Sequence, residues 1–289
     1  MDGDAIDLIR KHAGIKHNGC IVVSELGINH NGDVGLAKQL LTAAKTAGAD
    51  VAKLQMGRGH WIPLEQRAVK REWQGQIMSY QEYRQKLELS DGDLNKVSYH
   101  CDALELPLAF SAFDTESMNM VKLFDPPFYK IPSCKMNDMA LLECAQQEGK
   151  PVVVSTGMAD MDEVLRMAAE LTPADMLMHC VSCYPCEPRA CNLRVMASLT
   201  AMTGRWVGYS GHERGYQVTL AAAIMGAPMV ERHLTLDRTL LGTDQAASLE
   251  PHGFARMVRD IRICEQAQGD GVKRLLECEL PSRKKLRGD

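Results

Sequence analysis

Polar side chains recur in this chain wherever a short apolar stretch ends and a loop toward a helix-like stretch begins. In chain order they are Glu25, Lys53 with Gln55, Ser111, Lys130, Ser155, Cys180, Ser210 and His233. In a closed barrel of parallel strands, the carboxyl ends of all strands meet at one mouth, and that mouth carries the chemistry. The pattern therefore predicts that these side chains line a single site.

Eight apolar stretches, each followed by helix-like sequence, favour an α/β protein with a single-domain (β/α)8 TIM barrel. In one unit, Asp33 is a candidate N-cap, and Leu36 and Leu40 follow at helical spacing. We expect this helix to end near Gly48. An open doubly wound sheet is the alternative if fewer of the stretches are strands, but residues 27–35 lack the glycine spacing of a dinucleotide site.

The length of 289 residues suits one such barrel, which typically needs about 250. We predict an N-terminal extension at 1–19, a catalytic barrel at 20–268 and a C-terminal tail at 269–289. A long polar insertion, residues 56–95, follows the second strand. We expect the charged tail to lie on the surface.

The charge and hydropathy of the chain exclude two classes of partner. The net charge is −4 and no long basic run occurs, so the electrostatic footprint of a nucleic-acid-binding protein is missing. No apolar stretch approaches the roughly 20 residues of a membrane span, and the N-terminus lacks the features of a signal peptide. We expect a cytoplasmic protein that binds small molecules.

The sequence contains 10 cysteines, and four of them, Cys180, Cys183, Cys186 and Cys191, form a cluster that superficially resembles a metal or iron–sulfur site. The last spacing misses the ferredoxin pattern, and half of the cluster would lie in a strand and its exit loop. Without an export signal, reduced thiols are more common than disulfides. We therefore interpret these cysteines as incidental buried or loop thiols.

Two histidines and a carboxylate follow strands that a closed barrel makes neighbours. His212 lies two residues beyond the end of the seventh strand, His233 ends the eighth, and Glu25 ends the first. Adjacent strands are about 4.8 Å apart, so the three groups can converge on a divalent metal with open positions for water and substrate. An isolated histidine is more often a hydrogen-bonded packing residue, but the shared placement of these two favours the metal site.

A different set of side chains ends strands two to five. It puts two ammonium groups and several hydroxyls on one side of the mouth, from Lys53, Ser111, Lys130, Ser133 and Ser155. Such a set fits a phosphate-bearing anion. Salt-bridged lysines and ordinary loop serines are the alternative. A buried lysine is unfavourable without an anionic partner, and we expect a ligand phosphate to be that partner.

Seven segments of the chain carry a resemblance to a known family. They are IVVSELGINHNGD, AGADVAKLQ, FYKIPS, PVVVSTGM, HCVSCYP, VGYSGHERG and MVERHLTLDRTLLGTDQAASLEP. In this order, over residues 20 to about 280, they resemble the sialic acid synthase family. The resemblance implies a TIM barrel that condenses phosphoenolpyruvate with a hexosamine such as N-acetylmannosamine or its 6-phosphate. It further implies a nonulosonic acid product, Mn2+ or Mg2+ as cofactor, and a homodimer.

The resemblance also implies roles for individual residues. His212 and His233 match the metal ligands, and Glu25 is our candidate to orient or deprotonate the water that adds to the substrate. The positions that match the phosphoenolpyruvate site are Lys53, Ser111, Lys130, Ser133, Ser155 and Ser210. Those that match the acceptor site are Gln55, Tyr184 and Asp244. Asn29 and His30 either shape the rim or form a purely structural turn.

The segment after the fourth strand departs from the family pattern. Family members commonly carry K-I-G-S-G followed by an acidic residue, whereas this chain has KIPSCK, with Cys134 and Lys135 at the last two positions. The acidic residue helps to hold the acceptor, so we hypothesise that Lys135 favours an acceptor with an anionic group. A lysine turned to solvent is the alternative. Ser111 replaces a more usual threonine and keeps the hydroxyl.

A second departure is the end of the sequence at Asp289, near the point where most family members continue into a small antifreeze-like domain. An arginine of that domain contacts the N-acyl group in the partner subunit's site. Either the natural protein lacks this domain or this sequence is cut before it. Without the domain, a non-acylated acceptor is more plausible and the homodimer is less so.

Two other classes of function compete with the synthase. A Schiff-base barrel aldolase would use Lys130 or Lys53 as its nucleophile. A non-catalytic sugar-binding barrel would keep only the scaffold, but the joint presence of Glu25, His212 and Asp244 argues against it.

Treatment with pyruvate and borohydride separates the synthase from the aldolase. We expect no covalent labelling, measured by intact-protein mass spectrometry, because a phosphoenolpyruvate transferase forms no Schiff base. An increment of mass on Lys130 or Lys53 would establish the aldolase instead.

Overall fold

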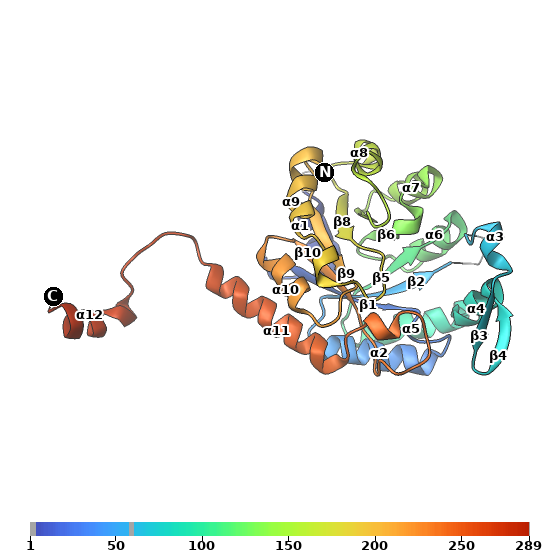
Figure 1. The fold of residues 1–289 in the computed structure, drawn as a ribbon, viewed down its shortest axis with the longest axis horizontal. Coiled ribbons are helices and arrows are strands. Elements are labelled where there is room, and N and C mark those ends of the chain that lie inside the picture. The colour runs from blue at the N-terminus through green and yellow to red at the C-terminus, as the bar shows by residue number, and fades with distance from the viewer. Residues whose placement is uncertain (1–3, 58–60, 289) are drawn as a thin grey trace.

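Eight parallel strands close into a barrel in the computed structural model, which describes residues 4–57 and 61–288 (Figure 1). Their order around the barrel is β1-β10-β9-β8-β7-β6-β5-β2, so the first and last strands are neighbours. The strands are β1 (Ile21–Gly27), β2 (Val51–Met56), β5 (Leu108–Ala112), β6 (Tyr129–Ile131), β7 (Val152–Ser155), β8 (Met176–Cys180), β9 (Val207–Gly211) and β10 (Met229–His233). The predicted single-domain (β/α)8 barrel is confirmed.

A helix follows each barrel strand and covers its outer face. These helices are α2 (Val34–Thr46), α5 (Asp91–Ala103), α6 (Thr115–Lys122), α7 (Met139–Gln146), α8 (Met161–Glu170), α9 (Arg194–Thr203), α10 (Gln217–Ile224) and α11 (Pro251–Gln268). Helix α2 begins as predicted, because the Asp33 carboxylate accepts a hydrogen bond from the Leu36 backbone N–H at 2.9 Å. It ends just before Gly48, whose φ of +85° suits a glycine.

The two-residue period of the strands decides which side chains reach the barrel interior. Val22 packs against the outer helices, whereas Ile21 and Val23 belong to the inner cluster. Continued along β1, the same alternation turns Glu25 inward, and it turns Lys53 inward on β2. The polar strand ends therefore share the inner surface of the barrel.

Helix α1 (Ala5–Ala13) contributes to the core at the amino-terminal end of the barrel. Its buried residues Ala5, Ile6 and Ile9 pack with Ile21, Met229 and other inward-facing strand residues. The helix begins at Asp4, whose carboxylate accepts hydrogen bonds from two backbone N–H groups. The segment that we predicted as an extension thus supplies apolar side chains to the barrel interior.

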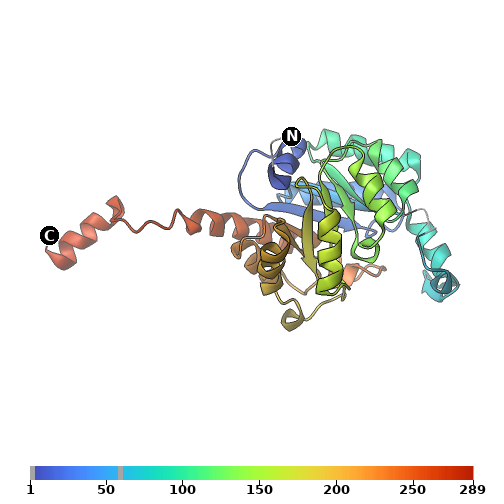
Figure 2. The same cartoon turned by 90° about the horizontal axis from the view of Figure 1, so that it is seen from above.

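The polar insertion after β2 folds into a unit of its own beside the barrel mouth. It contains α3 (Leu64–Arg67), the antiparallel strands β3 (Lys70–Trp73) and β4 (Gln76–Ser79), and α4 (Tyr80–Leu87). A small apolar cluster, including Trp73 and Tyr83, joins the insertion to Ile28 beyond β1. Figures 1 and 2 show this unit projecting at the opposite end of the molecule from the C-terminus.

The C-terminal segment leaves the barrel after α11 and ends in helix α12 (Leu280–Arg287), which lies away from the other helices in both views (Figures 1 and 2). No residue of α12 is buried. Within the described ranges, no helix is long and apolar enough to cross a membrane.

Substitution of Ile9 tests the contribution of α1. Ile9 is fully buried, so Ile9→Ala should lower the free energy of unfolding by about 2–4 kcal/mol through loss of apolar contacts and an unfilled cavity. Lys11→Ala, on the exposed face of the same helix, is the control and should change it by less than about 0.5 kcal/mol. Urea denaturation of both variants makes the measurement. Equal stability of the two variants would show that α1 is not part of the core.

Candidate active site

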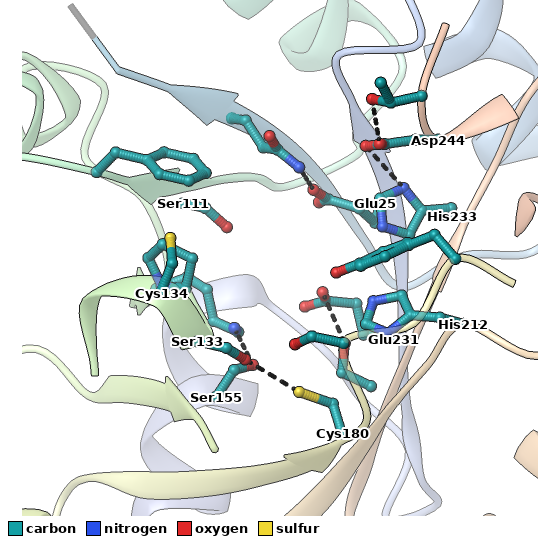
Figure 3. Close-up of a pocket in the computed structure, with 18 of the residues that line it drawn as sticks. Glu25, Ser111, Ser133, Cys134, Ser155, Cys180, His212, Glu231, His233 and Asp244 are labelled. Carbon is teal, nitrogen blue, oxygen red and sulfur yellow. Dashed lines mark hydrogen bonds and ion pairs between the residues drawn. The ribbon is translucent and has the colours of Figure 1, made fainter. Parts of the chain in front are cut away.

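A pocket of about 380 Å3 opens at the carboxyl ends of the barrel strands and contains nearly all the predicted site residues. Those that line it are Glu25, Lys53, Gln55, Ser111, Lys130, Ser133, Ser155, Tyr184, Ser210, His212, His233 and Asp244. Figure 3 shows the imidazoles of His212 and His233 on one side and the hydroxyls of Ser111, Ser133 and Ser155 on the other. The pocket therefore has two chemically different sides.

Lys53 is held at the bottom of the pocket by the side chains of neighbouring strands. Its ammonium lies 2.6 Å from Glu25 Oε2 and 3.5 Å from Glu231 Oε1, and it donates a hydrogen bond to Ser111 Oγ at 2.6 Å. Burial disfavours the charged form, but Glu231 and Glu25 outweigh it and raise the pKa of Lys53. The expected ligand phosphate is thus not needed to keep Lys53 charged, because protein carboxylates already do so.

Glu231 is a site residue that the sequence analysis missed. It lies two residues before His233 on β10, is 5% exposed, and accepts a hydrogen bond from Ser210 Oγ at 3.2 Å. Burial alone would raise the pKa of Glu231, but Lys53 and Lys130 lower it to about 2. The signal was present in the sequence, since a residue two positions before an inward-facing strand end also faces inward.

Lys130 differs from Lys53 in its partners. Its ammonium donates hydrogen bonds to Ser155 Oγ at 2.5 Å and to the Ile131 carbonyl at 3.4 Å. Across residues 4–57 and 61–288, it forms no ion pair with a carboxylate. Burial lowers the pKa of Lys130, although the more distant Glu231 opposes this effect. An anionic ligand would therefore stabilise the charge of Lys130 more than that of Lys53.

The two histidines face each other across the ends of β9 and β10, with ring centroids 5.5 Å apart. His212 Nδ1 lies 2.9 Å from the Val181 carbonyl, which can only accept, so Nδ1 carries the proton and Nε2 keeps its lone pair. Burial, together with the neighbouring imidazole of His233, lowers the pKa of His212 to about 3. Its neutral form is the one that binds a metal.

A buried ion pair behind the histidines joins the segments that carry them. Arg232 Nη1 lies 2.6 Å from Glu213 Oε1, and both side chains are fully buried. Arg232 precedes His233, and Glu213 follows His212. The pair therefore holds the ends of β9 and β10 in one arrangement, with both imidazoles on the pocket side.

Two side chains of the pocket, the imidazoles of His212 and His233, are suitable ligands for a divalent ion. His233 Nδ1 is buried and has no hydrogen-bond partner among the described residues, although Asp244 Oδ2 lies 3.7 Å away. Within the same part of the chain, no group of three or more His, Cys, Asp or Glu side chains is arranged to hold a metal. The structure thus offers two imidazoles, and further ligands would have to come from water and substrate.

The predicted acceptor residues lie near the histidines. The Tyr184 ring centroid is 4.1 Å from that of His212, and the Gln55 amide donates a hydrogen bond to Glu25 Oε1 at 3.0 Å. On the opposite side, Ser133 Oγ lies 3.1 Å from the Cys180 sulfur.

Three residues singled out in the sequence do not line the pocket. Lys135 pairs with Asp138 at 3.3 Å and is not among the residues that line the pocket. The Asn29 amide donates hydrogen bonds to the Leu234 carbonyl and to another side chain, and His30 Nδ1 accepts one from a backbone N–H within its own turn. Asn29 and His30 therefore build the structural turn, and the hypothesis that Lys135 reads an anionic acceptor has no support from its position.

The insertion contributes three lining residues that the sequence analysis did not include: Arg71, Tyr80 and Arg84. No local pattern marks them, because their place in the pocket depends on how the insertion packs against the barrel.

Comparison with known proteins identifies the family of the chain. Residues 40–273 match the NeuB family. The chain belongs to the NeuB family. The prediction of an enzyme of the sialic acid synthase type is thereby confirmed at the level of the family.

Curated members of the NeuB family share about a third of their residues with this chain. The N-acetylneuraminate-9-phosphate synthase of Mus musculus is 34% identical over 280 residues, covering 94% of this chain and 77% of that protein. The N,N'-diacetyllegionaminic acid synthase of Legionella pneumophila is 34% identical over 295 residues, covering 96% and 82%.

A solved structure has the same architecture. The N-acetylneuraminic acid (sialic acid) synthetase from Leptospira borgpetersenii serovar Hardjo-bovis, in complex with citrate, matches with a TM-score of 0.80 and 27% sequence identity. The match covers 94% of each chain. The barrel of this NeuB-family chain is thus the one on which related synthases are built.

Removal of Arg232 tests the ion pair behind the histidines. Arg232→Met leaves Glu213 buried without its cation and should lower the free energy of unfolding by about 3–5 kcal/mol. The double variant with Glu213→Gln should lose less than the sum of the two single variants. Arg238→Met, which breaks an exposed pair with Glu250, is the control and should cost less than about 1 kcal/mol. Equal effects of Arg232→Met and Arg238→Met in chemical denaturation would contradict the assignment.

Proposed function

We propose that the chain condenses phosphoenolpyruvate with an aldose, releasing phosphate and forming a 2-keto-3-deoxy sugar acid of the sialic acid type. The observation that carries this proposal is Lys130, which is buried, has no carboxylate ion-pair partner in the described part of the chain and lines the same pocket as His212 and His233. One side of such a pocket suits an anion and the other an electrophilic carbonyl.

Phosphoenolpyruvate would bind on the side of the pocket that carries lysines and serines. Lys130 and Lys53 supply positive charge for its phosphate and carboxylate, and the hydroxyls of Ser111 and Ser155 already lie within hydrogen-bond distance of these ammonium groups. Ser133 and Ser210 add hydroxyls from the neighbouring strand ends. A bound dianion would raise the pKa of Lys130, opposing the effect of burial.

The acceptor would bind on the side of the histidines, where Gln55, Tyr184 and Asp244 line the pocket. His212 and His233 would hold Mn2+ or Mg2+, and such an ion, when bound, polarises an aldehyde oxygen. The lining side chains would also orient the two substrates so that C3 of phosphoenolpyruvate faces the aldehyde carbon.

The reaction then proceeds in two stages. C3 attacks the aldehyde carbon, a carbon–carbon bond forms, and the aldehyde oxygen takes up a proton. C2 becomes electron-poor, and the carboxylates of Glu25 and Glu231 stabilise its positive charge. Water, oriented or deprotonated by Glu25, adds to C2. The bond from C2 to the phosphate oxygen breaks, phosphate leaves, and the C2 hydroxyl loses its proton to give the keto group.

One observation favours a second candidate. A lowered pKa is what a Schiff-base lysine needs, and burial lowers the pKa of Lys130. A barrel aldolase is therefore the alternative, although the curated relatives are named as synthases. A homodimer and a cytoplasmic location stay predictions.

Phosphate release from phosphoenolpyruvate, measured across a panel of aldoses with Mn2+, tests the proposed function. We expect release only when a suitable sugar is present, abolished by EDTA and restored by Mn2+, with a product whose mass equals the sum of the sugar and pyruvate. Lys130→Met should lower kcat/KM by about 100-fold or more, because it removes charge stabilisation in a buried site.

The exposed Lys96 on α5 provides the matched control, and Lys96→Met should retain full activity. Release of phosphate at the same rate with and without sugars, or full activity of Lys130→Met, would refute the proposal.

A further inference from the structure

Arg84 is a buried guanidinium at the wall of the pocket, and it has no anionic partner among the described residues. It lies on α4, is 6% exposed, and lines the pocket. Within the described ranges, Nε and Nη2 are buried without a hydrogen-bond partner, and no carboxylate pairs with the side chain. A buried charge without an acceptor for its donors is unfavourable unless a ligand supplies one.

Aromatic stacking holds Arg84 in place without satisfying its donors. The guanidinium carbon lies 5.1 Å from the centroid of the Trp61 ring and 5.7 Å from that of Phe113. Such stacking stabilises a cation through the ring faces and leaves the N–H groups in its plane for a hydrogen-bonding partner. The arrangement resembles a preorganised fork for a phosphate or carboxylate.

A second cation of the insertion lines the same part of the pocket. The guanidinium carbon of Arg71 lies 4.6 Å from the centroid of the Tyr80 ring, and both side chains line the pocket. The two arginines come from β3 and α4, which the insertion brings together.

The charge distribution of the pocket separates the arginines from the lysines. Lys53 is paired with Glu25 and Glu231 on the barrel strands, and Lys130 lies near Glu231. The other carboxylate that lines the pocket is Asp244.

Arg84 and Asp244 line the same pocket. Both charges act on Tyr83, where burial raises the pKa, Arg84 lowers it and Asp244 raises it. The arginines thus belong to the insertion, whereas the lysines stand on the barrel strands.

We propose that Arg84, assisted by Arg71, binds an anionic substituent of the sugar acceptor and thereby sets the acceptor specificity. The substituent is a phosphate monoester or a carboxylate, carried at a distance from the reacting aldehyde. This inference rests on the proposed function and names the substrate class of the same site. It assigns to Arg84 the preference for an anionic acceptor that the position of Lys135 does not support.

The test compares acceptors that differ in the group at C6, which is neutral in one and anionic in the other two. N-acetylmannosamine, its 6-phosphate and the corresponding uronate are each assayed by phosphate release from phosphoenolpyruvate. We expect the wild-type kcat/KM to favour one anionic sugar by about 10- to 100-fold, the range of a charge-assisted hydrogen-bonded pair. The anionic sugar with the higher kcat/KM identifies the recognised substituent as phosphate or carboxylate.

Arg84→Met keeps an unbranched apolar side chain against the two rings and should abolish most of this preference. Lys86→Met removes one positive charge from the exposed face of the same helix and should leave the preference unchanged. Arg84→Lys keeps the charge without the fork and should retain part of it. A side chain that served only the fold would lower the thermal stability when replaced, whereas removal of an unpartnered buried charge should not.

Two results would overturn the inference. One is a wild-type preference for the neutral sugar. The other is an Arg84→Met variant that raises KM for phosphoenolpyruvate while its acceptor preference stays intact, because Arg84 would then belong to the other substrate.

Absence of phosphate release with every sugar would refute the proposed function, and calorimetry then decides the inference separately. Binding of N-acetylmannosamine 6-phosphate that is lost in Arg84→Met and kept in Lys86→Met supports it. Equal binding by both variants overturns it.

Discussion

The ion pair between Lys53 and Glu25, buried where the strands end, is the constraint on which the site depends. Both side chains are almost fully buried, and their charged atoms lie 2.6 Å apart. A lysine in this position is stable only with carboxylates at hydrogen-bond distance. Glu25 comes from β1 and Glu231 from β10, so the pairing requires these strands to be neighbours, as barrel closure makes them. Closure of the barrel therefore brings together the carboxylates that keep Lys53 charged.

Residues that line the pocket come from the barrel strands and from the insertion after β2. The residues expected to react stand on barrel strands, where backbone hydrogen bonds on both sides fix their positions. Arg71 and Arg84 stand on the insertion after β2, which packs on the mouth through a small apolar cluster. Side chains on a segment outside the barrel can therefore be replaced without moving the groups on the strands.

Much of the fold and of the site could be predicted because both follow from short-range periodicity. The end of each apolar stretch marks an inward-facing position, and the chain order of the strands makes Glu25, His212 and His233 neighbours once the barrel closes. The prediction did not include Glu231, although the same two-residue period turns it inward, because the pattern was defined by the last residue of each strand. Lys135 was predicted to bind the acceptor because of its place in a motif. In the structure its ammonium pairs with Asp138 instead of lining the pocket.

The sequence by itself determined the barrel, the strand-end polar residues and the family, because hydrophobic period and motif order are local properties of the chain. Only the tertiary structure decided which charges are satisfied. Lys53 obtains two carboxylates from strands far apart in sequence, whereas Arg84 obtains two aromatic rings and no acid within the described residues. Whether a buried cation has a partner depends on distances between segments that only folding brings together, and those distances distinguish a structural charge from one that awaits a ligand.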